Sequence, residues 1–385
     1  LYVKKVFIMD DCKQLLPEWL NFMVGIVDSQ DIPLNVSREI LQQNKILTQI
    51  KNILTKKSIE LFCDLQENNE KYMKFYNSYD KMLKLGIHED SKNREKIMEL
   101  LRYNSLNNME KLISFNEYIE NKQTEQKSIY FITGTNKYVL ENSPLIESFK
   151  NKNIDVLYFT DPIDEYMIQH FKEYKELKMV DVSKEGIKFN EHKLKEKEES
   201  FKEVIKFIKE TLKDRIIDVK ITDRLTDTPC VLVTADYGWT ANMEKIMKAQ
   251  ALRNKEMDNL MSSRKILEIN PEDPIIIRVK EDIKDENKIE KSKHLIHFLF
   301  DNTMFISGFY VEDPSSYAKK VFNLVKLSYC QVEEDIPANI SETLNKNELK
   351  QDVKEYMETM KIDNNEEVVL NNEEVVLNNE DIEKM

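Results

Sequence analysis

The fold is decided by SIYFITGTNKYVLENSPLIESFKNKNIDVLYFTDPIDEYMIQHFKEYKELKMVDVS, residues 128–183. Apolar runs rich in β-branched and aromatic residues alternate here with amphipathic segments. The pattern predicts strands at 128–134, 154–160 and 177–183, with helices at 141–153 and 161–174. Strands that alternate with helices in this way predict a small parallel sheet with helices packed on it.

Before this stretch, residues 1–9 predict a strand, because Tyr2, Val6 and Ile8 fall on one face. Ser37 is a suitable N-cap for a long amphipathic helix that we expect at 38–65. The same 3.6-residue period predicts further helices at 70–85, 91–103 and 114–122.

After it, a Lys- and Glu-rich segment at 190–214 predicts a helix with one apolar stripe. Strands are expected at 216–222 and 229–235, and helices at 239–252, 291–306 and 315–329. The predicted fold class is α/β and α+β with several domains. We expect the domains to span 1–125, a small α/β subdomain at 126–190, and 195–335, followed by a tail at 336–385.

Composition excludes several functions. The net charge of −13, from 57 basic and 70 acidic residues, argues against a general nucleic-acid binder. The six glycines lie too far apart for a dinucleotide fingerprint or a P-loop. The four cysteines form no CxxC motif and do not indicate a disulfide scaffold. The sequence shows neither an apolar run of about 20 residues nor a signal peptide.

The two ends of the chain are unusual. The chain opens with LYVKKVFIM, a strand-like run without an initiator Met, so we expect it to be a fragment or a processed product. Near the other end, NNEEVVL occurs at 364–370 and again at 371–377. Two copies without an a/d stripe do not make a coiled coil, and the acidic composition predicts a disordered, low-complexity tail.

One polar motif precedes the long predicted helix. Arg38 lies in its first turn, where a cation opposes the helix macrodipole, and Gln42 follows one turn later. An arginine beside an amide donor, next to a loop, suits an anion such as phosphate. The alternative is an ion pair with a neighbouring carboxylate such as Asp31.

A second motif is DYGWTANMEKIMKAQ, residues 236–250, in which Trp239, Met243, Ile246 and Met247 share a helical face. Such a face is either an adaptable surface for varied partners or an ordinary core stripe. We expect Trp239 and Met243 to be exposed and Met247 to be partly packed.

Other candidate groups are weaker. His294 and His297 stand one turn apart, but no third ligand completes a metal site. No Ser-His-Asp or Cys-His set can be assembled from spacing. Asp161, Asp164 and Glu165 gather at a predicted helix start, where capping explains them.

Taken together, the chain resembles the heat-shock protein 90 family of chaperones over residues 1 to about 330. The stretches that carry the resemblance occur in family order and are LYVKKVFIMDD, PEWLNFMVGIVDSQDIPLNVSREILQQNK, KLGIHEDSKNREK, PIDEY, YGWTANMEKIMKAQALR, ILEINPEDPII and SGFYVEDP. The resemblance implies an ATP-dependent chaperone that assists client proteins as a homodimer. It also implies that the chain begins within the middle domain and ends after a C-terminal dimerisation domain.

The resemblance assigns roles to particular residues. Arg38 matches the arginine that reaches the γ-phosphate of ATP, and Gln42 matches its helper, so both are implied to be catalytic. ATP and Mg²⁺ would be bound by an N-terminal domain that this sequence lacks, so the chain alone should not hydrolyse ATP. The client-binding residues are implied to be Trp239, Met243 and Met247. A four-helix bundle across the dimer is implied to use Leu295, Phe298, Leu299, Val321, Leu324 and Val325.

The partners and compartment follow less directly. The chain ends in DIEKM, which is neither the MEEVD that docks tetratricopeptide-repeat co-chaperones nor the KDEL of the endoplasmic reticulum. The stretches SPLIESFKNKNIDVLYFTDPIDEY and NLMSSRKILEINP look closer to organellar members, of endoplasmic-reticulum or plastid type, so an organelle is expected. The alternative function is a truncated, dimerising scaffold or client-binding module without an ATP cycle.

Overall fold

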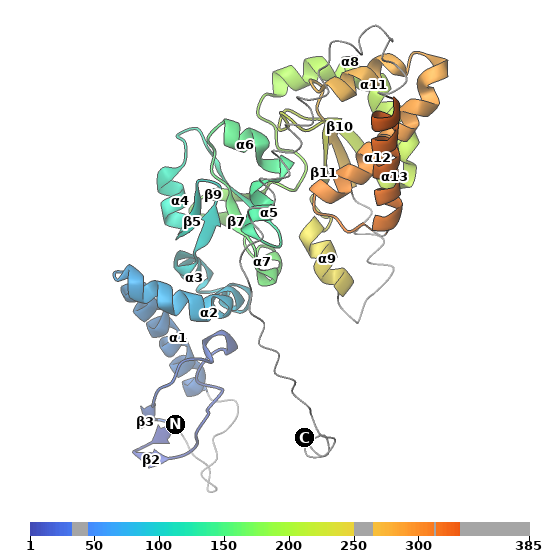
Figure 1. The fold of residues 1–385 in the computed structure, drawn as a ribbon. Coiled ribbons are helices and arrows are strands. Elements are labelled where there is room, and N and C mark those ends of the chain that lie inside the picture. Colours follow the sequence, from blue (N-terminus) through green and yellow to red (C-terminus); the bar gives the residue numbers. More distant parts are fainter. Residues whose placement is uncertain (33–44, 250–264, 312, 332–385) are drawn as a thin grey trace, which may run out of the picture. The chain divides into compact units, whose positions relative to one another are not determined.

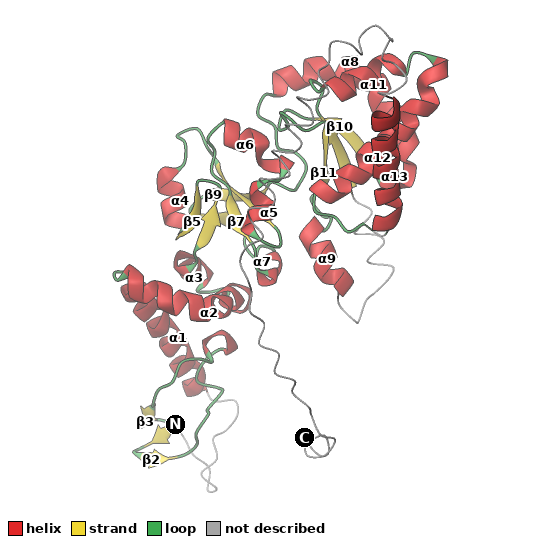
Figure 2. Cartoon of the chain, viewed as in Figure 1, coloured by secondary structure: helices red, strands yellow, loops and turns green. Residues whose placement is uncertain are grey.

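The computed structural model describes residues 1–32, 45–249, 265–311 and 313–331 (Figure 1). The chain divides into two compact units, Leu1–Pro314 and Ser315–Met385. Helix α13, Pro314–Gln331, is the part of the second unit that is described. Helices and strands mix throughout the first unit, so the fold class is α/β as predicted (Figure 2).

The N-terminal residues form a small sheet rather than one strand. Strands β1 (Tyr2–Val3) and β2 (Val6–Phe7) pair antiparallel, and β3 (Asp28–Ser29) pairs parallel to β1. The prediction of a single strand over 1–9 is wrong, because Lys4 and Lys5 adopt positive φ angles of 49° and 65° and turn the chain back. The segment continues into a short 3-10 helix, η1 (Glu18–Leu20).

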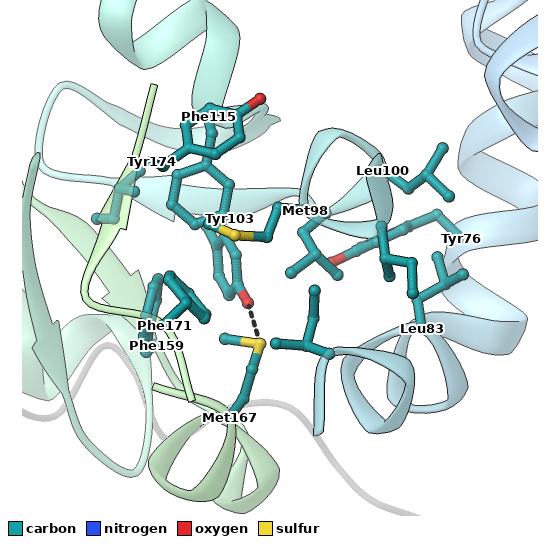
Figure 3. Packing of buried hydrophobic residues seen from close by; sticks show 14 of the residues in the cluster. Tyr76, Leu83, Met98, Leu100, Tyr103, Phe115, Phe159, Met167, Phe171 and Tyr174 are labelled. Carbon is teal, nitrogen blue, oxygen red and sulfur yellow. Dashed lines mark hydrogen bonds between the residues drawn. The ribbon is translucent and has the colours of Figure 1, made fainter. Parts of the chain in front are cut away.

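Three helices follow: α1 (Lys45–Leu65), α2 (Asn69–Glu89) and α3 (Arg94–Leu100). The predicted start of the first at residue 38 lies outside the described residues. The third ends earlier than its predicted end at 103, because Leu101 has extended φ and ψ angles of −75° and 149°. The apolar faces of α2 and α3 share one core with the sheet that follows, in which Tyr103, Phe115 and Phe159 are buried (Figure 3).

The described strands of residues 103–181 form a six-stranded sheet with the order β5-β4-β7-β6-β9-β8. At its centre, β6 pairs parallel with β7 and with β9, so the predicted parallel sheet is confirmed. The sequence prediction missed the antiparallel hairpin on one side and the short strand β8 on the other. The strand bounds are β4 Tyr103–Ser105, β5 Asn108–Ile113, β6 Ser128–Thr133, β7 Leu157–Phe159, β8 Glu173–Tyr174 and β9 Leu177–Asp181.

The helices of this sheet are shorter than predicted. Within 161–174 only α7 (Pro162–Met167) is helical, and the chain then turns into β8. The segment 141–153 divides into the 3-10 helix η2 (Pro144–Ile146) and α6 (Glu147–Asn151), because Pro144 starts a new turn. The remaining helices of this part are α4 (Phe115–Asn121), which matches its prediction, and α5 (Lys137–Glu141).

A second sheet follows, with the order β10-β12-β11. Its strands are β10 (Asp218–Ile221), β11 (Cys230–Thr234) and β12 (Lys265–Ile269); the last was not predicted. Three helices pack in one core with this sheet: α8 (Glu191–Leu212), α11 (Pro274–Asp282) and α12 (Ile289–Ile306). Two short 3-10 helices, η3 (Lys213–Arg215) and η4 (Glu286–Lys288), lie between them in sequence. Helix α9 spans Ala241–Ala249.

Arg224 joins the six-stranded sheet to the sheet β10-β12-β11. Its side chain is fully buried and makes a two-pronged ion pair with Glu268 of β12, at 2.6 Å and 2.7 Å. The same guanidinium donates to the backbone oxygens of Val182 and Lys184, which follow β9, at 2.7 Å and 3.0 Å. A buried cation with all these acceptors fixes the chain after β9 against the second sheet.

Gly86 of α2 provides a test of this packing. A Cβ atom added at this position would lie 2.8 Å from the indole ring of Trp19, which is fully buried. We therefore expect Gly86→Ala to destabilise the chain by about 1–3 kcal/mol, although alanine is the better helix former. Gly25→Ala, which meets no atom within 4 Å, is the matched control. Urea denaturation measures both, and a stabilised Gly86→Ala variant would contradict the packing.

Candidate functional site

A buried ion cluster joins α2 to α7. Lys84 Nζ lies 3.0 Å from Asp164 Oδ1, contacts the carboxylate of Asp161, and has a side chain only 4% exposed. The Tyr103 hydroxyl donates to Asp164 at 3.2 Å. Burial raises the pKa of Asp164 to about 6, although Lys84 opposes the shift. Because a buried charge is costly without a partner, this cluster fixes where α7 packs on α2.

The next residue of α7, Glu165, binds a different element. Its buried carboxylate accepts a hydrogen bond from the Thr240 hydroxyl at 2.7 Å, and burial raises its pKa. The Thr240 hydroxyl in turn accepts from the N–H of Met243 at 3.0 Å and so caps α9. Two consecutive acidic residues of α7 thus hold α2 and the start of α9.

The residues that the sequence assigned to clients lie in α9 or just before it. Trp239 precedes α9 and is half-buried, so the prediction that it is exposed is wrong. Met247 of α9 is partly packed, as predicted. Met243 is only 7% exposed, so the prediction that it is exposed is wrong for the described chain. Its backbone N–H donates to the Thr240 hydroxyl, and α9 as a helix packs against α7. The 3.6-residue period predicted this face of the helix but could not predict whether other elements cover it.

The other side of α9 is held by charge. Glu244, which is buried, lies 2.7 Å from Lys248 Nζ and 3.0 Å from Lys265 Nζ. Lys248 Nζ also lies 4.6 Å from the centroid of the Tyr310 ring. Two tyrosines near α9 are exposed, Tyr310 beside Lys248 and Tyr237 just before the helix, with the latter 84% exposed. We call Trp239, Met247, Tyr237 and Tyr310 the α9 surface.

The predicted dimer residues differ in exposure. Leu299 is buried in the core of the second sheet, together with Phe300 and Ile296, so it does not lie on an exposed face. Leu295 and Phe298 of α12 and Val321 of α13 are half-buried, whereas Val325 is 54% exposed. The side chain of Leu324 is not among those that the structure describes.

Arg38 and Gln42 also lie outside the described residues, so the structure does not place them. Within the described ranges, no group of three His, Cys, Asp or Glu side chains could hold a metal ion. None of the described helices is both long enough and apolar enough to span a membrane.

Comparisons with known protein sequences show the family of the chain. The sequence model of the Hsp90 protein family matches residues 1–361. The chain is 42% identical to heat shock protein 83 of Leishmania donovani, over 89% of this chain and 77% of that protein. It is 41% identical to the endoplasmin homolog of Hordeum vulgare and 39% identical to the chloroplastic heat shock protein 90-5 of Arabidopsis thaliana. The chain belongs to the Hsp90 family.

The matched lengths differ among these relatives. The alignments with the barley and Arabidopsis proteins cover 85% of this chain but only 43% of each relative. The chain thus spans less than half the length of these two plant proteins. Because heat shock protein 83 matches as well as the endoplasmin and chloroplastic proteins do, the comparisons do not separate the branches of the family.

The sequence reasoning missed Lys84 and Thr240 and interpreted Asp164 and Glu165 only as capping residues. The capping role is present, because Asp164 accepts from the N–H of Asp161 at 3.0 Å. A signal for Lys84 was available, since this lysine interrupts the apolar face of LKLGI in α2. A charge at a core position of a helix indicates a buried partner.

We expect Lys84→Met to test the ion cluster through its dependence on pH. At pH 8 Asp164 is ionised and would lose its partner, which costs about 3–5 kcal/mol. The wild-type pKa of Asp164 is about 6, and removal of Lys84 raises it further, so at pH 5 the carboxyl takes up a proton. The loss should therefore shrink at pH 5. Urea denaturation at the two pH values, each against wild type, measures this.

The matched control is Lys81→Met, which removes an exposed lysine of the same helix and should change stability by at most about 0.5 kcal/mol. Equal losses for Lys84→Met at both pH values would show that Asp164 does not carry the effect.

Proposed function

We propose that this chain is the client-binding and dimerising part of an ATP-dependent chaperone that assists protein folding as a homodimer. The match of residues 1–361 to the Hsp90 family is the observation that carries the proposal. The α9 surface supports it, because Trp239 and Met247 are half-buried and Tyr237 and Tyr310 are exposed. A mixed surface of methionine and aromatic side chains can adapt to varied apolar partners.

The role of Met243 changes within this proposal. As a buried residue that is fixed by the cap of α9, it would support the surface rather than contact clients. Clients would then meet Trp239 and Met247 together with Tyr237 and Tyr310. The two tyrosines present large, rigid rings with a polar tip, which suits partly apolar, partly polar client segments.

An aggregation assay tests the α9 surface. We expect the Trp239→Ala and Met247→Ala double variant to lose most of its ability to suppress aggregation of a heat-denatured client, while its own unfolding changes little. Met243→Ala should instead cost about 2–5 kcal/mol of stability, because it empties part of a core. Val24→Ser, which changes a valine that is 96% exposed elsewhere, is the matched control. If the double variant still suppressed client aggregation fully, the α9 surface would not be the client-binding site.

We propose for Arg38 and Gln42 the catalytic roles that the family resemblance implies. This proposal rests on the sequence, because both residues lie outside the described part of the chain. They would contact the phosphates of a nucleotide that another segment holds with Mg²⁺. Arginine suits this role because its guanidinium presents several donors in a fixed plane. Client binding is the activity for which this chain can be tested directly.

We also propose that α13 contributes to the dimer. Helices that pair across a two-fold axis bring apolar side chains together, and the apolar side chains of Phe322 and Val325 in α13 are 63% and 54% exposed. We expect Val325→Asp to convert a dimer into a monomer in sedimentation experiments at micromolar concentration. Asn323→Asp adds the same charge at an exposed neighbour and should remain dimeric. A dimer that survives Val325→Asp would place the interface elsewhere.

An organellar location remains a proposal. It rests on sequence stretches similar to endoplasmic-reticulum and plastid members. The relatives named endoplasmin homolog and chloroplastic protein are compatible with an organelle.

A further inference from the structure

A pocket opens where the six-stranded sheet of residues 103–181 meets the start of α9. It is lined by Thr133 and Thr135 at the end of β6, by Ser183 after β9, and by Thr240 and Lys245. Apolar side chains form another part of its wall and are contributed by α5, η2 and the end of α12: Val139, Leu140, Leu145 and Ile306. The pocket therefore offers hydroxyl groups and one ammonium group next to an apolar surface.

The topology of the sheet explains why a pocket lies here. From β6 the chain crosses to β7 on one side, and from β7 it crosses back to β9 on the other side. Thr133 and Thr135 at the end of β6 and Ser183 after β9 line the pocket together, at the carboxyl ends of these two neighbouring strands. In open α/β sheets this switch point is where ligands bind.

Lys245 is the charged group of the pocket. It is half-buried, and burial lowers its pKa. Its neighbour Lys248 has an ion pair with Glu244, but among the described residues no carboxylate oxygen lies within 4 Å of Lys245 Nζ. The charge of Glu244 acts on Lys245 and raises its pKa, but only from beyond ion-pair distance. An anion in the pocket can therefore pair directly with the ammonium group.

Two further features favour an oxyanion beside Lys245. The Thr133 hydroxyl is buried and makes no hydrogen bond of good geometry, although it lies close enough to Glu165 to lower the pKa of that carboxyl. Thr240 caps the N–H of Met243, which leaves the amides of Ala241 and Asn242 in the first turn of α9 without intrahelical acceptors. Both Ala241 and Asn242 line the pocket.

Glu165 lies beside the pocket, and its charge opposes an anion there. The opposition is reduced by the ammonium group of Lys184, which attracts Glu165 and donates to the backbone oxygen of Gly238. The Glu165 carboxylate is also occupied by the Thr240 hydroxyl. Among the residues that line the pocket, Lys245 is the one with a charged side chain.

We propose that this pocket binds a small molecule that joins one oxyanion group, a phosphate or a carboxylate, to a short apolar group. The oxyanion pairs with Lys245 and with the hydroxyl and amide groups at the start of α9. The apolar group packs on Val139, Leu140 and Ile306. Client binding on the α9 surface does not require this site, so the two proposals can fail independently.

Isothermal titration calorimetry of the full chain with phenyl phosphate, benzoate and benzyl alcohol tests the proposal without any client. We expect one site per chain for the two anions and weaker or no binding of the uncharged alcohol. A tighter fit for phenyl phosphate would identify phosphate compounds as the source, and a tighter fit for benzoate would identify carboxylates. Lys245→Met should weaken the better anion tenfold or more, because a charge-assisted hydrogen bond is lost.

Two variants complete the test. Thr135→Trp keeps Lys245 but fills the mouth of the pocket from an exposed position, and it should also abolish binding. Lys291→Met removes an exposed lysine outside the pocket and should leave binding unchanged. Absence of anion binding to the wild type, or equal binding to wild type, Lys245→Met and Thr135→Trp, would overturn the proposal.

Discussion

The ion pair between Lys84 and Asp164 is the interaction on which the arrangement of the first unit depends. It lies inside the packed core between α2 and α7, where water cannot replace either partner. Each charge is tolerable only because the other is present, and the Tyr103 hydroxyl satisfies a further oxygen lone pair of Asp164. Helix α7 is therefore held at one position on α2 by polar geometry rather than by apolar contact alone.

The same short helix transmits this position to α9. Asp164 and Glu165 are adjacent in sequence, so the backbone that places one carboxylate on Lys84 places the other on Thr240. Thr240 then sets the first turn of α9, and with it Met243, Lys245 and the α9 surface. The proposed client surface and the proposed ligand pocket thus share a single structural support, although their contact residues differ.

Much of this fold could be predicted from local patterns. The parallel order of β6, β7 and β9 followed from alternating strand and helix segments, because that pattern depends on neighbours in sequence. Strand β12 was missed because Glu268 interrupts its apolar run, and the partner that permits a buried carboxylate there, Arg224, lies 44 residues away. The hairpin β4–β5 was missed because Tyr103 continues the apolar period of the preceding helix.

The candidate site was predicted less completely for a related reason. Periodicity identified the face of Trp239, Met243 and Met247, but whether a face is covered depends on α7, which is distant in sequence. Asp164 and Glu165 of α7 were interpreted as caps because capping depends on neighbours in sequence. The ion pair of Asp164 with Lys84 and the hydrogen bond of Glu165 with Thr240 join residues that are distant in sequence. Long-range polar contacts leave no periodic signal, so residues such as Lys84 and Thr240 emerge only from the structure.

The 80-residue separation between Lys84 and Asp164 has a consequence for how the chain is made. When α2 leaves the ribosome, Lys84 has no partner and keeps its water shell, because α7 has not yet been synthesised. The face of α2 that carries Lys84 therefore cannot lose its water and become buried until α7 has been synthesised. During that interval, the solvated ammonium group keeps the apolar side of α2 from docking prematurely on other apolar segments. A residue that stabilises the finished fold thus also delays its assembly until the correct neighbour exists.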